Sequence, residues 1–195
     1  MGTESLPKSM SKPFFTIGHS TRAIDEFVAL LMTAEVKLVV DVRTVPRSRT
    51  NPQFNRDALP ASLAAHGIAY EHFAALGGLR GKQPGVSPDV NAFWENASFR
   101  NYADYALSVE FHSGLEKLRA LGHATCSTIM CAESLWWRCH RRIIADYLIA
   151  AGEEVLHVLG PGHTEPARMT PTARVEPDGT LAYPKDSQPM LDLRP

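Results

Sequence analysis

The chain has 195 residues, of which 44% are hydrophobic and 21% charged, and its formal net charge is −1. This composition is typical of a globular protein and excludes a disordered chain, and the small net charge gives no whole-chain argument for a nucleic-acid or membrane partner. Three cysteines, no apolar run of signal-peptide length and no run of spanning length predict a soluble, cytoplasmic protein without membrane contact.

Along the chain, a polar and flexible tail is expected over residues 1–12, followed by a single domain over residues 13–195. Short apolar runs that alternate with helical repeats indicate strands and helices in turn. Strands are expected at 14–17, 36–42, 68–73, 124–130 and 155–159. Helices are expected at 24–31, 57–66, 98–121 with a break near 113–114, and 141–151, followed by a hairpin at 173–183. The pattern predicts an α/β fold: a mostly parallel central sheet of about five strands, helices on both faces and a small C-terminal β-hairpin.

Three polar clusters follow the first, second and fourth of these strands, at residues 18–22, 41–49 and 131–142. Parallel strands end at a common edge of the sheet, which is where open α/β sheets bind their ligands. We therefore expect one polar, arginine-rich site at this edge. The residues expected to converge in one cleft are His19, Asp41, Arg43, Glu133 and Arg141.

Charge favours the same location. Residues 42–56, 76–88 and 134–145 hold nine basic residues and no acidic ones, so the other 11 basic and 21 acidic residues lie elsewhere. This asymmetry predicts an anionic ligand. The alternative is that these loops are simply polar and that their arginines pair with acidic residues. The expected ligand-binding residues are Ser20, Arg43, Ser48, Arg80, Lys82, Arg138, His140 and Arg141.

In combination and in order, these motifs resemble a widespread bacterial family catalogued as domain of unknown function 488, and the likeness covers residues 15–184. The resemblance implies a small α/β fold and brings no established reaction, cofactor or catalytic residue. The segments that carry it are Gly18-His19-Ser20, Asp41-Val42-Arg43 with Pro46 and Ser48, Leu76-Gly77-Gly78, Met130-Cys131-Ala132-Glu133 and Cys139-His140-Arg141.

Four residues are candidates for catalysis. Cys131 is either a small core side chain or a reactive thiolate, because nearby arginines and a helix start lower the pKa of a thiol. Glu133 and Asp41 are either general bases or ion-pair partners of an arginine. His19, after a glycine in a tight turn, is either a proton shuttle or a turn residue.

A metal site is weighed and not expected. Cys131, Cys139 and His140, with His19 nearby, are residue types that bind zinc. However, seven residues separate the two cysteines, which is not the spacing of a zinc finger or ribbon, and the surrounding arginines repel a cation. The sequence indicates no particular cofactor and no oligomeric state.

Arg141 and Arg142 open a helix, where the helix dipole disfavours cations, so a negative group is expected beside Arg141. Glu133, Asp41 and a bound ligand are the candidates, and the ligand is favoured because one carboxylate cannot neutralise three arginines. On that basis Arg141→Ala is expected to stay folded and to lose the rise in melting temperature that anions give the wild type. The first functional hypothesis is an enzyme or binding domain for a phosphorylated or nucleotide-like molecule, with thiol chemistry or hydrolysis as the reaction. One alternative is a nucleic-acid-binding module in which Trp136 and Trp137 stack on bases, and the other is a regulatory or interaction protein with a structural polar cluster.

Overall fold

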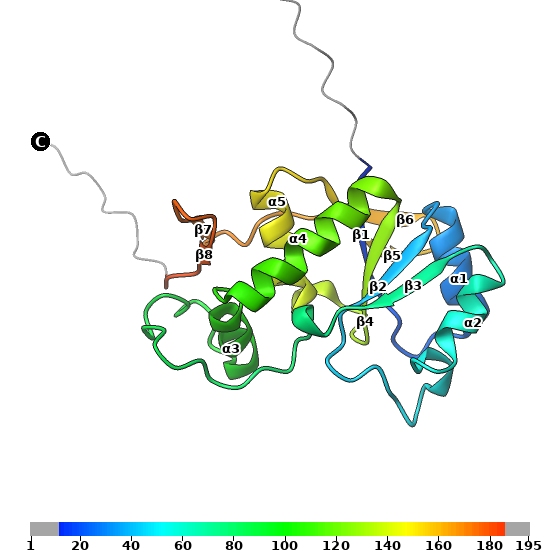
Figure 1. Cartoon of the computed structure of the whole chain (residues 1–195), viewed down its shortest axis with the longest axis horizontal. Coiled ribbons are helices and arrows are strands. Elements are labelled where there is room, and N and C mark those ends of the chain that lie inside the picture. The colour runs from blue at the N-terminus through cyan, green and yellow to red at the C-terminus, as the bar shows by residue number, and fades with distance from the viewer. Residues whose placement is uncertain (1–11, 186–195) are drawn as a thin grey trace, which may run out of the picture.

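The computed structural model describes residues 12–185, so the tail expected over residues 1–12 lies, apart from Lys12, outside the described residues (Figure 1). The central sheet has six strands: β1 (Phe14–Gly18), β2 (Leu38–Asp41), β3 (Ala69–His72), β4 (Ser127–Cys131), β5 (Val155–Gly160) and β6 (His163–Pro166). Five α-helices accompany it: α1 (Ile24–Thr33), α2 (Leu59–Ala64), α3 (Ala97–Tyr105), α4 (Val109–Ala124) and α5 (Arg141–Ala150). Strands β7 (Arg174–Val175) and β8 (Leu181–Ala182) form the expected C-terminal hairpin.

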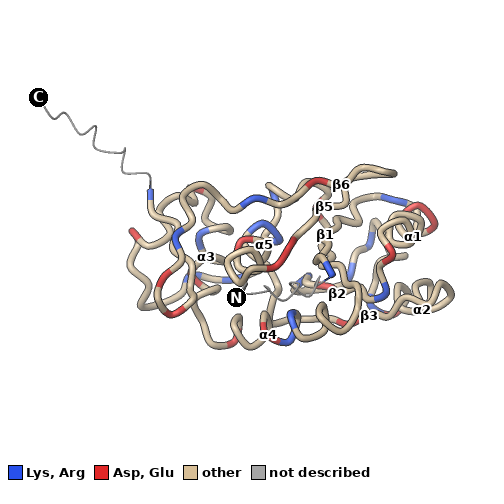
Figure 2. Tube along the Cα trace, turned by 90° about the horizontal axis from the view of Figure 1, so that it is seen from above, with Lys and Arg blue, Asp and Glu red and all other residues tan. Residues whose placement is uncertain are grey.

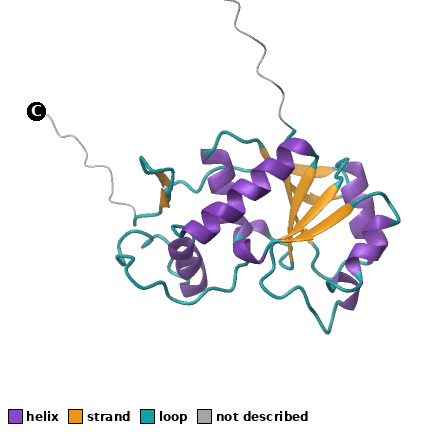
Figure 3. Cartoon of the chain, in the orientation of Figure 1, coloured by secondary structure: helices purple, strands orange, loops and turns teal. Residues whose placement is uncertain are grey.

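The sheet order is β3-β2-β4-β1-β5-β6, and every neighbouring pair is parallel except β5 and β6. The chain runs from β1 to β3 in one direction across the sheet and then returns through β4 to β5. Because crossovers between parallel strands are right-handed, this reversal sends the two sets of helices to opposite faces. Helices α1 and α2 cover one face and α3, α4 and α5 lie on the other (Figures 1 and 3).

Alternation along each strand supplies a core on each side of the sheet. On β2, Val39 packs with the side chains of α1 and α2, whereas Leu38 and Val40 pack with those of α4 and α5. On β4, Met130 and Ile129 divide between the two cores in the same way. This burial on both faces explains why the central strands β1, β2 and β4 are mostly apolar, whereas the parallel edge strand β3 is only partly buried and carries Glu71 and His72.

Three details of the sequence-based prediction are wrong. The fourth strand begins at Ser127 and not at 124, because α4 continues to Ala124. Strand β6 was not expected: its four residues are all exposed at the sheet edge and lack an apolar alternation. The break in the long helical stretch lies at residues 106–108 and not near 113–114, because the Ser108 side chain caps α4 by accepting from the Phe111 amide. Gly114 instead lies within α4, where a side chain would crowd Ala75 and Leu76.

On the far side of α5 from the sheet, Asp146 holds the C-terminal segment against the helix. Its carboxylate accepts from the Thr170 amide at 2.9 Å and from the Tyr183 hydroxyl at 3.1 Å. Burial raises the pKa of Asp146 to about 6, although the two hydrogen bonds act in the opposite direction. The folded protein therefore holds a proton on Asp146 in a pH range where the unfolded chain has lost it.

Because the folded protein binds this proton more tightly than the unfolded chain does, its free energy of unfolding should fall as the pH rises. Because the folded pKa lies above its ordinary value of 3.8, Asp146 should cost the fold about 2–3 kcal/mol between pH 4 and pH 7. The Asp146→Asn variant carries no charge at this position, and its amide can accept from the Thr170 amide and donate to the Tyr183 hydroxyl. Urea unfolding of both proteins across this range should show the wild type losing stability relative to Asp146→Asn. Parallel curves would contradict the prediction.

Candidate functional site

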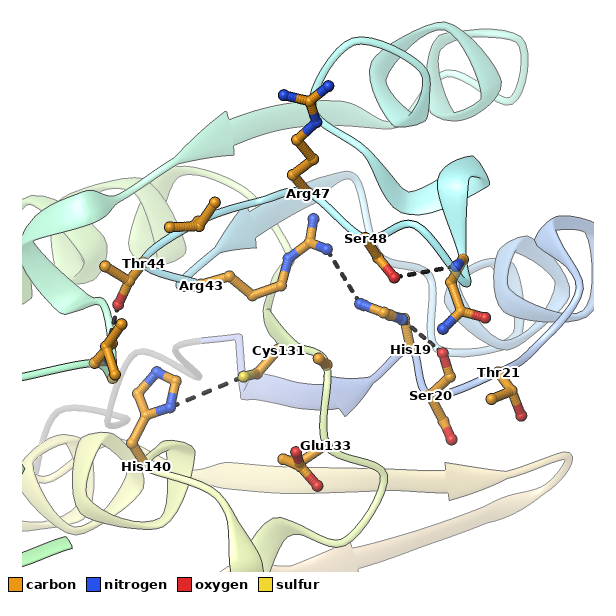
Figure 4. A pocket seen from close by; sticks show the side chains of 15 residues that line it. His19, Ser20, Thr21, Arg43, Thr44, Arg47, Ser48, Cys131, Glu133 and His140 are labelled. Carbon is orange, nitrogen blue, oxygen red and sulfur yellow. Dashed lines mark hydrogen bonds between the residues drawn. The ribbon is translucent and has the colours of Figure 1, made fainter. Parts of the chain in front are cut away.

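The carboxyl edge of the sheet carries a cleft of about 640 Å³. The loops after β1, β2 and β4, which are neighbours in the sheet, form its walls together with Gly78 and Leu79 (Figure 4). Seven of the expected site residues line it: His19, Ser20, Arg43, Ser48, Cys131, Glu133 and His140. Three loops that are distant in sequence therefore meet at one edge of the sheet.

Five expected site residues lie outside the lining. Asp41 and Arg141 are buried behind it. Arg80 lies 3.7 Å over the Tyr105 ring and donates to main-chain carbonyls. Lys82 is exposed and is not among the residues that line the cleft. Arg138 lines a separate cavity of about 160 Å³. The basic residues that were expected at the site therefore do not all gather in the cleft.

Figure 2 shows this dispersion: basic positions occur near the β2–β3 side and around α3 and α5, with acidic positions among them. Arg142, for example, lies 4.9 Å over the Trp94 ring and donates to the Thr170 hydroxyl. The expected local excess of nine positive charges is thus shared between the cleft and the α3–α5 region.

Asp41, at the end of β2, anchors Arg43. Its carboxylate accepts from the amide, Nε and Nη2 of Arg43, the last at 2.6 Å, and from the Tyr70 hydroxyl at 2.7 Å. Asp41 is fully buried and Arg43 is 6% exposed. Burial, which lowers the pKa of Arg43, is outweighed by the hydrogen bonds and charge of Asp41, so the pKa is raised. Asp41 therefore orients Arg43 and has no free lone pair for use as a general base.

His19 contacts the same arginine. Because a guanidinium only donates, the 3.1 Å contact with Arg43 Nη1 makes His19 Nε2 the acceptor, and Nδ1 then donates to the Ser20 carbonyl at 2.8 Å. Burial lowers the pKa of His19 to about 4, although the bond to Ser20 acts in the opposite direction. His19 is therefore neutral near pH 7, and its basic nitrogen is occupied by Arg43.

The loops after β1 and β4 are joined through their main chains. The amides of His19 and Ser20 donate to the carbonyls of Cys131 and Ala132, both at 2.9 Å. Gly18 permits this approach, since a Cβ there would overlap the Glu133 carbonyl oxygen. Glycine at position 18 is thus a packing requirement, and it keeps the two walls in a fixed relation.

Two thiols and an imidazole lie together at the cleft floor. His140 Nδ1 is 3.8 Å from Cys131 Sγ and 3.7 Å from Cys139 Sγ, and both thiols are free. The hydrogen bond to Cys139, followed by burial, raises the pKa of Cys131. Burial also opposes a charge on Cys139, but the bond from Cys131 and the neighbouring His140 and Arg141 lower its pKa well below the usual range. Of the two thiols, Cys139 is therefore the one whose surroundings favour the thiolate form.

Arg141 is 1% exposed at the first position of α5. It donates to Cys139 Sγ at 3.3 Å, to the Thr16 hydroxyl at 3.3 Å and to the Glu133 carbonyl. Among residues 12–185 it forms no ion pair with a carboxylate. Neither candidate carboxylate therefore pairs with Arg141: Asp41 pairs with Arg43, and Glu133 contributes only its main-chain carbonyl. The side-chain acceptor that the sequence did not suggest is the sulfur of Cys139.

Several residues that line the cleft were not predicted as site residues: Thr21, Thr44, Val45, Arg47, Asn51, Leu79 and Ala132. Most belong to loops already singled out, so their position after β1 or β2 was an available signal. Tyr70 and Phe54, which hold Asp41 and Arg43 in place, gave no such signal because they follow in later elements.

Comparison with known proteins gives one match. The family described as "Domain of unknown function DUF488" matches residues 23–148, a range that includes the loops after β2 and β4 and excludes Gly18-His19-Ser20. No curated protein and no solved structure matches the chain. Within residues 12–185, none of the helices has the length and apolar character needed to cross a membrane.

Proposed function

The chain belongs to the DUF488 family, whose function is unknown, and from the geometry of its cleft we propose that it binds a small anionic molecule of the phosphorylated or nucleotide-like kind. The volume of about 640 Å³ suits a ligand of that size. The position at the carboxyl ends of β1, β2 and β4 is the usual binding location in an open α/β sheet.

The observation that carries the proposal is the fixed guanidinium of Arg43. A guanidinium has five N–H donors. Asp41, His19 and the Phe54 carbonyl account for four of them, with one N–H of Nη1 remaining beside the cleft. A donor held by four other contacts needs no reordering to meet a ligand oxygen, which favours anion binding at little entropic cost.

Positive charge at the rim supports the same ligand class. Because Asp41 neutralises Arg43, the uncompensated cation of the lining is Arg47, which is exposed and forms no ion pair among the described residues. Hydroxyls of Ser20 and Thr21, on the loop after β1, and of Ser48, on the loop after β2, also line the cleft (Figure 4). Donors of this kind commonly accompany an arginine in phosphate recognition.

Reactive groups lie next to this ligand position. Cys131 and His140 line the cleft, and the Cys139 sulfur lies 3.7 Å from His140 Nδ1. An enzyme that acts on the bound anion through these groups is therefore the form of the proposal that we favour. Nucleic-acid binding is less well supported, because the ring of Trp136 stacks on His157 at 4.4 Å and is occupied within the protein.

The proposal can be tested by thermal unfolding with inorganic phosphate and nucleoside monophosphates. Ligand binding should raise the wild-type melting temperature by mass action. Arg47→Ala should weaken binding of the active probe by about tenfold, since a charge-assisted hydrogen bond contributes about 1.5–3 kcal/mol. Arg49→Ala is the matched control, because Arg49 is also exposed, two residues away, and is not among the residues that line the cleft.

A panel in which no anion raises the melting temperature, or in which Arg49→Ala loses the effect as Arg47→Ala does, would contradict the proposal. The salt dependence of binding distinguishes this proposal from nucleic-acid binding. Binding of a small anion in the cleft should fall modestly with added salt, whereas a nucleic-acid complex with many phosphate contacts weakens steeply.

A further inference from the structure

We propose that Cys131, Cys139 and His140 bind a zinc ion at the floor of the cleft, in a site of the two-cysteine, one-histidine type. The ligand atoms of these three residues lie within 4.8 Å of one another. The set was set aside on sequence grounds because its spacing differs from that of zinc fingers and ribbons. The proposal goes beyond the anion site and does not depend on it.

The distances agree with tetrahedral coordination. With Zn–S near 2.3 Å and Zn–N near 2.0–2.1 Å, a tetrahedral ion separates a sulfur ligand from a nitrogen ligand by about 3.6 Å. His140 Nδ1 lies 3.8 Å from one sulfur and 3.7 Å from the other. The two sulfurs of such a site are about 3.8 Å apart, and here they lie within 4.8 Å of each other, so an ion can be accommodated with side-chain movements of at most about 1 Å.

His140 is oriented as a metal ligand. Its Nε2 donates to the Val42 carbonyl at 3.0 Å, so the lone pair of the neutral ring is on Nδ1, the atom that faces both sulfurs. Histidines that bind metals generally donate their other ring N–H to a carbonyl or carboxylate in this way. Gly78 leaves room for the ring, since a Cβ at that position would overlap His140 Nδ1.

Charge balance is also favourable. Two thiolates neutralise Zn²⁺, so the nearby guanidinium of Arg141 meets a neutral cluster instead of a bare cation. Its Nε donates a hydrogen bond to Cys139 Sγ at 3.3 Å, and hydrogen bonds of this kind to a ligand atom orient it for metal binding. From the sequence alone, Arg141 was expected to repel a metal cation. Its hydrogen bond to the Cys139 sulfur depends on the fold and could not be foreseen.

The fold explains the unusual spacing. Cys131 ends β4, while Cys139 and His140 come directly before α5, and the intervening residues form a loop with a short 3-10 helix at Trp136–Arg138. The return of the chain brings both ends of this loop together. Three protein ligands leave a fourth position, and since Cys131 and His140 line the cleft, we assign it to a water or to an oxygen of the cleft's ligand.

The test starts from full-length protein purified with a reductant and without chelator or added metal. Mass spectrometry of the metal content should find close to one zinc per chain. After removal of the zinc, titration with Co²⁺ should give the intense near-ultraviolet absorption of cobalt–thiolate bonds, together with the visible bands of a tetrahedral site. His140→Asn and Cys139→Ser should each weaken zinc binding by at least about tenfold.

Cys126→Ser is the matched control, because Cys126 is the third cysteine of the chain and lies at the opposite end of β4, near the Ala34 carbonyl. It should keep the zinc and the cobalt spectrum. Wild-type protein that is folded by circular dichroism, yet holds no zinc and gives no cobalt–thiolate band, would overturn the proposal without recourse to any variant. A Cys131–Cys139 disulfide in the freshly purified protein would overturn it as well.

Failure here is distinguishable from failure of the proposed function. The zinc measurements use no anion, and the Arg47→Ala and Arg49→Ala comparison can be repeated with the metal removed. Anion binding without zinc, or zinc without anion binding, leaves one proposal standing and removes the other.

Discussion

Replacement of Asp41 by alanine is expected to lower the free energy of unfolding by about 3–5 kcal/mol. The reason is the guanidinium of Arg43, which is 6% exposed and would lose its bidentate partner while remaining buried. The Tyr70 hydroxyl would lose its acceptor in the same change. Urea unfolding monitored by circular dichroism measures the difference.

Two further variants separate a broken ion pair from a general loss of packing. The double variant Asp41→Ala/Arg43→Met should be more stable than Asp41→Ala alone, because no unpaired charge remains in the interior. Glu71→Gln is the exposed control: its 3.4 Å pair with Lys117 is open to solvent and should contribute less than about 1 kcal/mol. An Asp41→Ala protein as stable as Glu71→Gln would show that Arg43 finds solvent or another partner.

The sequence was sufficient to predict that the chain forms five parallel strands. Strands buried on both faces must be apolar along their whole length, so the runs at 14–17 and 36–42 are visible as strands without knowledge of their neighbours. The edge strand β6 has no such requirement, since all four of its residues are exposed. Its existence follows from main-chain pairing with β5, which leaves little trace in side-chain type.

The meeting of the three polar loops at one edge of the sheet was predictable for a topological reason, while the contacts of their residues were not. Loops that follow parallel strands share an edge, whichever residues they contain. Which carboxylate meets which arginine depends instead on side-chain reach and on the partners supplied by other elements. Asp41 turns back to Arg43 two residues later, and the exposed Glu133 presents only its carbonyl to Arg141. The organisation of residues 13–195 as one domain stays a prediction.

Replacement of Arg141 by alanine is expected to lower the free energy of unfolding by about 3–5 kcal/mol. The guanidinium is almost fully buried, and its removal strips Thr16, the Glu133 carbonyl and the Cys139 sulfur of a donor and leaves a cavity. The sequence alone suggested the opposite outcome, a folded Arg141→Ala protein that only loses protection by anions. Thermal and urea unfolding without added anion distinguish the two.

Arg142→Ala is the control that isolates the cause. Both arginines occupy the first turn of α5, where the helix dipole disfavours a cation, so an effect dominated by the dipole would make each replacement neutral or stabilising. Burial differs between them: Arg142 is half-buried over Trp94, and its loss should cost about 1 kcal/mol. A large loss for Arg141→Ala beside a small one for Arg142→Ala would mean that the buried contacts outweigh the dipole. Equal effects would show that Arg141 does not support the cleft floor.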